Sequence, residues 1–259
     1  MTDLLPLSGI LNGRDFGGYV TASGRVVKKG KLYRTAHHAN ATDDDLAALS
    51  GLGLSAIVDL RRPSEKARQP SRRWDDCAVT IIENDIEEEY LGWQDFLPGK
   101  EPTIDLFREH SLEFYRRAPF MERFEDLFGR YFRTLADTDG PVLIHCVAGK
   151  DRTGLLAALT HSLAGVHQDD ITEDYLRTNA LTGDRPDVHQ TVAAYITELC
   201  GSAPEDETVR YALGCQAEWL DASFRTIEQR HGTIDAYFEQ ALGVDAETRE
   251  RLHDRLLGD

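Results

Sequence analysis

Residues 141–154 read PVLIHCVAGKDRTG, and this stretch decides the fold that we expect for the whole chain. Residues 141–145 form a short apolar run with the composition of a buried strand, and residues 153–164 (TGLLAALTHSLA) predict an apolar helix. The loop between them contains Gly149 and joins the strand directly to the helix. This order of elements is typical of an α/β sheet.

The chemistry of this loop suits an oxyanion. The backbone N–H groups of residues 147–152 can all turn inward around one anion, and the following helix directs its partial positive end at the same point. Gly149 permits a close approach of the backbone. Arg152 offers two parallel donors to two phosphoryl oxygens, which a lysine cannot do with the same geometry. We therefore expect a phosphate to be bound by Arg152 and by the residues of the loop, Val147, Ala148, Gly149 and Lys150.

Cys146 stands six positions before Arg152 and is the expected nucleophile. A cysteine beside a cation and a helix N-terminus ionises more readily than an ordinary thiol, so a thiolate is expected at neutral pH. Thr153 could donate its hydroxyl to this sulfur. The competing structural interpretation is a buried cysteine and a surface arginine flanking a turn. Sulfurtransferases of the rhodanese type usually have a shorter loop, and arsenate reductases need a second cysteine close by.

The composition favours a globular protein that does not bind nucleic acid. The 259 residues carry a net charge of -16, which disfavours attraction to nucleic acid or to an anionic membrane surface. Residues 1–75 are an exception, with 12 basic against 8 acidic side chains. The chain has no apolar run of about 18 residues and no signal-peptide pattern, so we expect no stable membrane insertion and a cytoplasmic location, with leaderless export as the alternative. The four cysteines form no CxxC pair, which argues against disulfides and zinc; Cys77, Cys200 and Cys215 are expected in the core.

The remaining sequence predicts one α/β domain over residues 1–259, with a helical C-terminal layer. Residues 25–27 and 31–34 suggest an N-terminal hairpin, residues 55–60 and 78–82 buried strands, and residues 42–53 a capped helix. Residues 83–101 hold seven acidic side chains without a clear period, and we interpret residues 83–120 as a mobile lid or insertion. Further helices are expected at 104–117, 121–135, 171–178, 188–199, 215–230, 233–242 and 247–257.

The loop HCVAGKDRTG at residues 145–154 resembles that of the atypical bacterial protein tyrosine phosphatases. The resemblance spans nearly the whole chain and follows the family order through NGRDFGG (12–18), KLYRTA (31–36), VDLRRPSE (58–65), DYLRTN (174–179) and TIEQRHGTIDAYFEQALGV (226–244). It implies a mainly parallel central sheet flanked by helices, a helical lid, and no metal or other cofactor. It also implies activity on phosphotyrosine, with phosphoserine, phosphothreonine and phosphoinositides as further substrates.

Taken together, these features predict a metal-free phosphomonoesterase with a phosphocysteine intermediate. A general acid must protonate the leaving oxygen and later act as a base toward water. Asp151 inside the loop and Asp85 after the strand at 78–82 compete for this role, and the resemblance places a family aspartate at both positions. The structural alternatives are an ion pair that orients the arginine for Asp151 and a solvated acidic run for Asp85.

Several other side chains leave two interpretations open. Lys150 could hold an additional phosphate, which supports a phosphoinositide or inositol-phosphate phosphatase, or it could be a solvated lysine. A structural role is at least as well supported for Arg14 with Asp15 and for Asp59 with Arg61, and His145 is expected to shape the loop. An inactive phosphate-binding module is the alternative of another class. The substrate would be a phosphorylated protein or a phosphoinositide, and the oligomeric state does not follow from the sequence.

Overall fold

The computed structural model describes residues 3–87, 90, 92–182 and 185–259. Within these ranges the strands are β1 (Arg14–Asp15), β2 (Val26–Val27), β3 (Leu32–Thr35), β4 (Ala56–Asp59), β5 (Thr80–Ile82), β6 (Val142–His145) and β7 (Leu257–Gly258). The helices are α1 (Asp43–Gly51), α2 (Pro63–Arg68), α3 (Trp93–Phe96), α4 (Ile104–Arg117), η1 (Ala118–Phe120), α5 (Glu122–Asp137), α6 (Asp151–Ala164), α7 (Gln168–Thr182), α8 (Pro186–Cys200), α9 (Asp206–Leu213), α10 (Ala217–His231), α11 (Ile234–Gln240) and α12 (Ala246–Leu256). In these described ranges, the helices lack the length and apolar character that crossing a bilayer needs.

The main sheet has the strand order β1-β3-β6-β4-β5. The pairs β3–β6, β6–β4 and β4–β5 are parallel, and β1 is added antiparallel at one edge. The predicted α/β class with a mainly parallel central sheet is therefore confirmed. Strand β6 lies in the middle and is buried along its whole length, as expected for a parallel strand covered on both faces.

Alternating side chains of the central strands supply two apolar cores. Ile57 and Leu143 pack with Leu46 and Leu49 of α1 on one face of the sheet. The neighbours of these strand residues point to the other face and join the aromatic side chains of α5 and the apolar side of α6. Because side chains alternate along a strand, a four-residue strand such as β6 contributes to both cores.

The helix predicted after Thr42 is confirmed as α1. The Thr42 hydroxyl accepts a hydrogen bond from the backbone N–H of Asp45 at 3.1 Å, and the Asp45 carboxylate accepts one from the backbone N–H of Thr42 at 2.9 Å. This reciprocal pair is a capping box. The same carboxylate also accepts hydrogen bonds from the backbone N–H groups of Ser8 and Gly9, so the cap ties the N-terminal segment to α1.

The predicted N-terminal hairpin is wrong. Strand β2 pairs antiparallel with β7 at the opposite end of the chain, while β3 lies between β1 and β6 in the main sheet. The turn residues before β3 are compatible with a hairpin, but both edges of β3 are already occupied by other strands. Local turn chemistry therefore could not reveal the pairing.

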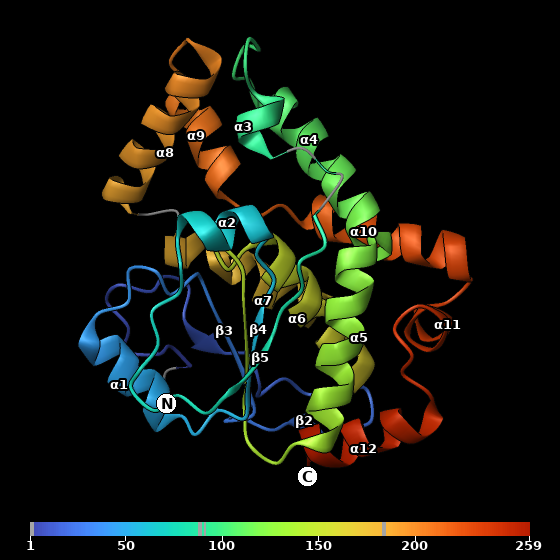
Figure 1. Cartoon of the computed structure of the whole chain (residues 1–259). Helices are drawn as coiled ribbons and strands as arrows, with labels where there is room; N and C mark the ends of the chain where they lie inside the picture. The colour runs from blue at the N-terminus through green and yellow to red at the C-terminus, as the bar shows by residue number, and fades with distance from the viewer. Residues whose placement is uncertain (1–2, 88–89, 91, 183–184) are drawn as a thin grey trace.

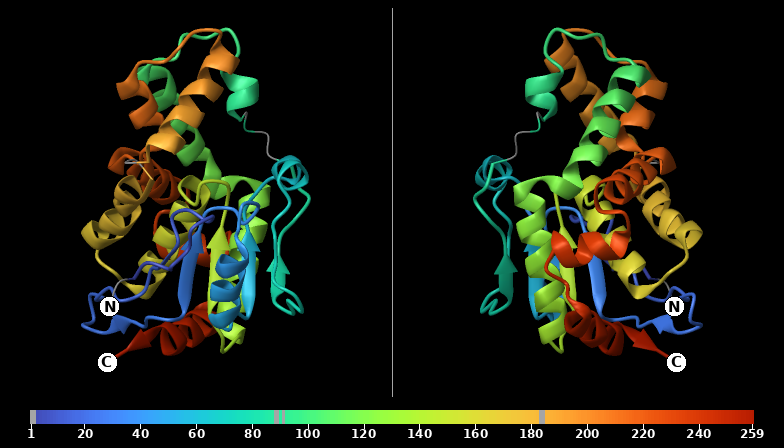
Figure 2. Two further views of the ribbon diagram at one scale, coloured as in Figure 1. Left: turned by 90° about the vertical axis from the view of Figure 1, so that its left-hand side faces the viewer. Right: turned by 90° about the vertical axis from the view of Figure 1, so that its right-hand side faces the viewer.

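The predicted insertion at residues 83–120 forms only part of a larger structure above the carboxyl ends of the strands. Its helices α3 and α4 stand beside α8 and α9, and Figures 1 and 2 show these four helices as one lobe at the end of the molecule opposite the two termini. A separate small core, made of Leu97, Phe107, Ile196 and Ala212, joins them. Helix α9 was not expected, and α8 was expected only within the C-terminal layer. Residues 88, 89 and 91 of the predicted insertion lie outside the described residues.

Central strand β6 should be sensitive to loss of volume. We expect Val142→Ala to lower the free energy of unfolding by about 2 kcal/mol, because its side chain is fully buried and two methyl groups are lost. Val20→Ala is the matched control, since Val20 is 55% exposed, and it should change stability by less than about 0.5 kcal/mol. Urea denaturation of the parent and both variants measures this, and equal losses at the two positions would contradict the packing of β6.

Candidate active site

The loop that carries Cys146 emerges at the centre of the sheet. In the parallel register, His145 at the end of β6 is level with Thr35 at the end of β3 and with Asp59 at the end of β4. The three strand ends thus form one platform, at the edge where α/β proteins place their ligand sites. Helix α6 begins at Asp151, directly after the loop.

Backbone contacts turn the loop carbonyl groups away from its centre. The carbonyl oxygen of Val147 accepts a hydrogen bond from the backbone N–H of His37 at 3.0 Å. That of Gly149 accepts two, from Asn12 Nδ2 at 2.7 Å and from Arg34 Nη2 at 3.0 Å. In a trans peptide the N–H points opposite to the carbonyl group, so these contacts direct the following N–H groups inward. This is the arrangement predicted for an oxyanion cradle.

Gly149 is required by the shape of the loop. Its backbone has φ +65°, in the left-handed region that side chains disfavour. A Cβ atom at this position would lie 2.4 Å from the carbonyl oxygen of Thr35. The close approach seen here is to the end of β3, and the expected approach of the Gly149 backbone to an anion stays a prediction.

The loop borders a cleft of about 650 Å³. Cys146 is only 2% exposed and lines this cleft together with the other loop residues Val147, Ala148, Lys150, Asp151 and Arg152. The structure thus brings together six of the nine residues that the sequence suggested for the site. Gly149 and Thr153 belong to the loop and to α6 but do not line the cleft.

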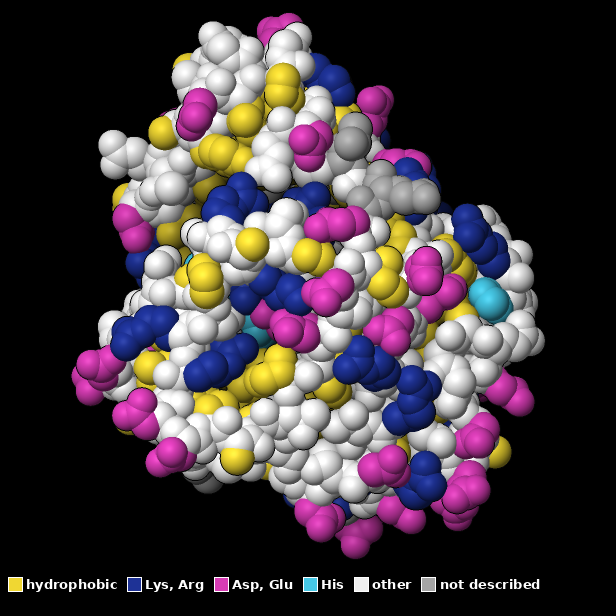
Figure 3. Space-filling model, in the orientation of Figure 1, with side chains coloured by type: hydrophobic (Ala, Val, Ile, Leu, Met, Phe, Trp, Pro, Cys, Tyr) yellow, Lys and Arg dark blue, Asp and Glu magenta, His cyan; other side chains and the backbone are white. Residues whose placement is uncertain are grey.

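The walls of the cleft are mostly apolar and aromatic. The aromatic side chains come from the segment before α3 and from α3, α4 and α8, and they are Tyr90, Trp93, Phe107, Phe114, Tyr115 and Tyr195. Arg62, directly before α2, and Arg68 of α2 also line the cleft, and Arg68 Nη1 donates to Oε1 of Gln94 in α3 at 2.8 Å. Figure 3 shows Lys and Arg side chains gathered across the waist of this face, below the lobe of α3 and α8, with hydrophobic side chains around them.

A carboxylate holds Arg152 in place. The Nη1 and Nη2 atoms of Arg152 donate to Oε2 and Oε1 of Glu65 at 2.6 and 3.0 Å, and Nη1 also donates to the carbonyl oxygen of Leu60 at 3.2 Å. Such a bidentate pair fixes the plane of the guanidinium group. Burial alone would raise the pKa of Glu65, but Arg152 and Arg62 outweigh this effect and lower the pKa to about 2. Glu65 therefore stays ionised at physiological pH and keeps its pairing with Arg152.

Lys150 is not the solvated lysine that we considered. Its side chain is buried, its Nζ atom donates to the carbonyl oxygen of Ala212 at 2.8 Å, and it lies 5.5 Å from the centre of the Trp219 ring. The amine thus joins the loop to the end of α9. This contact brings the C-terminal half of the chain to the edge of the cleft.

Asp151 faces the cleft and belongs to a chain of hydroxyl groups. Tyr115 donates to Asp151 Oδ1 at 3.0 Å, and the hydroxyl groups of Tyr115 and Tyr175 are 2.6 Å apart. Burial raises the pKa of both phenols well above 10, with a further contribution from Asp151 at Tyr115 and from Cys215 and Asp151 at Tyr175, so both remain protonated donors. Asp151 does not pair with Arg152 in this arrangement, because Glu65 already does.

Asp85 lies apart from the other predicted site residues. Its side chain is 95% exposed, its Oδ1 is 3.6 Å from Nζ of Lys66, and it does not line the cleft. Strand β5, which precedes it, is the edge strand farthest from β3, and β4 separates it from β6. This placement matches the solvated alternative for Asp85.

Thr153 does not contact the sulfur as expected. Its hydroxyl is buried and has no hydrogen-bond partner among the described residues, Cys146 included.

Of the three other cysteines, only Cys215 is a buried core residue, and burial raises the pKa of its thiol to about 12. Cys77 is half-buried and belongs to neither core, so its expected core location is wrong, whereas the half-buried Cys200 packs against the small core of the lobe.

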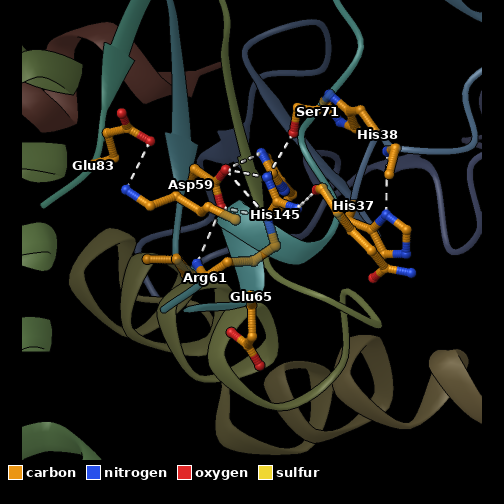
Figure 4. Close-up of polar contacts among 12 residues, drawn as sticks. His37, His38, Asp59, Arg61, Glu65, Ser71, Glu83 and His145 are labelled. Carbon is orange, nitrogen blue, oxygen red and sulfur yellow. Dashed lines mark hydrogen bonds and ion pairs between the residues drawn. The ribbon is translucent and has the colours of Figure 1, made fainter. Parts of the chain in front are cut away.

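His145 belongs to a buried polar cluster beneath the loop (Figure 4). Asp59 binds Arg61 through Oδ1 and Oδ2, and its Oδ2 is 3.6 Å from Nε2 of His145, whose ring stacks on that of His38. Burial lowers the pKa of His145 to about 4 despite the nearby Asp59 charge. The ring is thus neutral at physiological pH, which fits the expected structural roles of His145, Asp59 and Arg61.

The Arg14–Asp15 ion pair considered above is not formed. Arg14 Nε pairs with Asp174 Oδ1 at 3.1 Å, and Arg34 Nη1 pairs with Oδ2 of the same carboxylate at 2.7 Å. Asp15 instead accepts hydrogen bonds from the backbone N–H groups of Gly17 and Gly30. The two arginines lie directly behind the loop.

Sequence reasoning missed the partners of the site residues. Glu65 and Tyr115 contact Arg152 and Asp151, and Asn12 and Arg34 contact Gly149. Glu65, Asn12 and Arg34 all fall within motifs that carried the family resemblance, which is the one signal that could have singled them out. No spacing rule connects them with the loop, because they lie about 85 to 135 residues away from it in the sequence.

Known proteins are similar to this chain over nearly its whole length. Residues 5–258 match the model of a family described as the tyrosine phosphatase family. A candidate tyrosine-protein phosphatase of Cupriavidus necator is 37% identical over 93% of this chain and 85% of its own. The triple specificity protein phosphatase PtpB of Mycobacterium tuberculosis is 30% identical over 97% of this chain and 98% of its own. A tyrosine-protein phosphatase of Nostoc commune is 29% identical over 86% of this chain and 73% of its own.

The pairing of Glu65 with Arg152 makes a prediction about acid stability. Because the pKa of Glu65 is depressed from 4.5 to about 2 in the folded protein, its contribution is complete above about pH 4.5 and is lost as the pH falls toward 2. We expect the stability difference between the parent and Glu65→Gln to shrink by on the order of 3 kcal/mol over this window. Urea denaturation at pH 5, 3.5 and 2 measures it. Glu247→Gln, at an exposed glutamate, is the control, and a difference that does not change with pH would contradict the pairing.

Proposed function

The chain belongs to the tyrosine phosphatase family, and we propose that it hydrolyses phosphotyrosine in proteins through a phosphocysteine intermediate formed on Cys146. Membership of the family confirms the resemblance drawn from HCVAGKDRTG. The observation that carries the proposal is the position of Cys146 at the cleft, beside a loop whose carbonyl groups are turned away from its centre.

In the proposed reaction, the thiolate of Cys146 attacks phosphorus in line with the bond to the leaving oxygen. The backbone N–H groups of residues 147–152 and the guanidinium group of Arg152 bind the other phosphoryl oxygens, where charge develops in the transition state. Glu65 supports this role, because it fixes the guanidinium plane before substrate arrives.

We assign the general acid to Asp151. It lines the cleft beside Cys146, and Tyr115 holds one of its oxygens from the buried side. The carboxyl group would protonate the leaving oxygen in the first step and accept a proton from water in the second. Asp85, exposed and paired with Lys66, is the weaker candidate.

The aromatic walls favour an aromatic phosphoester as substrate. Side chains such as Tyr90, Trp93 and Phe114 can stack against a phosphotyrosine ring whose phosphate reaches Cys146. One relative is named a triple specificity protein phosphatase, so phosphoserine and phosphothreonine join the proposed range. Phosphoinositides are the second candidate; Arg62 and Arg68 at the cleft favour them, whereas the amine of Lys150 is already bound to Ala212.

Turnover of para-nitrophenyl phosphate tests the proposed chemistry. We expect the parent protein to hydrolyse it equally well with and without a chelator, and Cys146→Ser to lose at least about 10⁴-fold in kcat, because the nucleophile is gone. Cys77→Ser, at a half-buried cysteine away from the cleft, should keep the parent rate. A parent protein without activity would favour the phosphate-binding module. If it is active, a panel of phosphopeptides and phosphoinositides then ranks the two substrate classes.

The choice of leaving group identifies the acid. We expect Asp151→Asn to lower kcat for phenyl phosphate by about 10² to 10⁴-fold and to affect para-nitrophenyl phosphate much less, because a good leaving group needs little protonation. Asp85→Asn should stay within about twofold of the parent on both substrates, since its side chain is exposed and does not line the cleft. The reverse pattern would transfer the role to Asp85, and small equal losses would reject both assignments.

A further inference from the structure

The carbonyl oxygen of Gly149 is held from behind by two buried side chains. Asn12 Nδ2 and Arg34 Nη2 both donate to it, at 2.7 and 3.0 Å. Both donors come from the N-terminal third of the chain, and both are buried. Two side-chain donors restrain the orientation of this carbonyl group, in addition to the restraint from the strand and the helix that flank the loop.

These donors are themselves fixed by a buried ionic cluster. Asp174 of α7 binds Arg34 through Oδ2 at 2.7 Å and Arg14 through Oδ1 at 3.1 Å. Arg14 Nη1 in turn donates to Asn12 Oδ1 at 2.5 Å, which orients the Asn12 amide so that its NH₂ group faces Gly149. Contacts therefore run without a break from Asn12 through Arg14 and Asp174 to Arg34, and we call these four residues the rear clamp. The two ends of the rear clamp, Asn12 and Arg34, both donate to the carbonyl oxygen of Gly149.

The rear clamp has a direct consequence for the front of the loop. The peptide between Gly149 and Lys150 is planar and trans, so drawing its oxygen backward directs the N–H of Lys150 toward the side where Cys146 lies. Gly149 has φ +65° and carries no side chain that would help to hold this peptide in place. Backbone donors contribute most to binding an anion when they are oriented in advance.

The buried charges of the rear clamp also favour an anion at the front of the loop. The rear clamp contains two guanidinium groups and one carboxylate, all nearly inaccessible to solvent. Burial and the neighbouring Arg34 lower the pKa of Arg14 to about 10, which still leaves it protonated at physiological pH. A buried excess of positive charge behind the loop favours negative charge in front of it, where solvent screening is weak.

We propose that Asn12 and Arg34 are positioning residues for catalysis, which hold the Gly149 peptide so that the loop binds the phosphoryl group. This inference rests on the proposed function, because it takes the ligand of the loop to be a phosphoryl oxyanion. The role goes beyond stabilising the fold, since the two donors converge on a single peptide of the loop.

The test compares Arg34→Met and Asn12→Gly with the parent protein. Asn12 has φ +58°, so glycine removes the amide without straining the backbone. We expect each variant to weaken the binding of inorganic phosphate, measured by titration calorimetry, by about tenfold, and to lower kcat/KM for para-nitrophenyl phosphate by roughly ten- to a hundredfold. Because both donors act on one oxygen, the double variant should lose less than the product of the two single losses.

Arg255→Met is the matched control. Arg255 also donates to a glycine carbonyl oxygen, that of Gly140, but before β6 and thus at the opposite end of the strand from the loop. Its kcat/KM and phosphate affinity should stay within twofold of the parent, whatever the loss of thermal stability. If Arg34→Met does not fold, Asn12→Gly alone decides the test.

Two results would overturn the inference. The first is a folded Arg34→Met or Asn12→Gly protein with parental phosphate affinity, and the second is an equal loss in Arg255→Met. The proposed function fails separately, if the parent binds phosphate but does not hydrolyse para-nitrophenyl phosphate. A parent that does not bind phosphate at all would reject both.

Discussion

The arrangement of the site depends on one constraint, which is that a loop binding an oxyanion must turn its N–H groups inward and therefore its carbonyl groups outward. Outward carbonyl groups in a buried loop need donors of their own, because an unpaired buried carbonyl is costly. His37, Asn12 and Arg34 supply these donors at Val147 and Gly149. The N-terminal third, which holds these three residues, is thus part of the site although it does not contain the nucleophile.

The same constraint explains the charge distribution beneath the cleft. The chain carries a net charge of -16, yet the loop is surrounded by arginines that pair with single carboxylates: Arg152 with Glu65, Arg61 with Asp59, and Arg14 and Arg34 with Asp174. Each carboxylate accepts at least two hydrogen bonds and remains ionised, because its pKa is lowered by the arginines it holds and, at Asp59, first by the neighbouring His145. These pairs orient the cations and keep them from collapsing onto the loop when no substrate is bound.

Local signals predicted the loop and its flanking elements well, because these depend on neighbouring residues. The run VLIH became β6, Gly149 adopted the left-handed conformation that glycine permits, and the helix expected at residues 104–117 has those bounds in the structure. Prediction failed where distant segments meet. The pairing of β2 with β7, the role of α8 and α9 beside the cleft, and the contact between Glu65 and Arg152 all join residues far apart in sequence. Periodicity and turn chemistry carry no information about such pairs.

The cleft combines a floor and an upper wall that rest on different hydrophobic clusters, which α4 joins through Tyr115 in the main core and Phe107 in the small core. Its floor is the loop, supported by the buried arginines and the main core, whereas its upper wall rests on the small core of Leu97, Phe107, Ile196 and Ala212. The amine of Lys150 binds Ala212 and so links the two parts. Changes at wall residues such as Trp93 can therefore alter which phosphoester fits, whereas a change at Tyr115 would also remove the hydrogen bond to Asp151. The difference between floor and wall fits the sequence, in which the loop forms a specific motif, HCVAGKDRTG, whereas the helices α3, α8 and α9 of the wall belong to no motif that we identified.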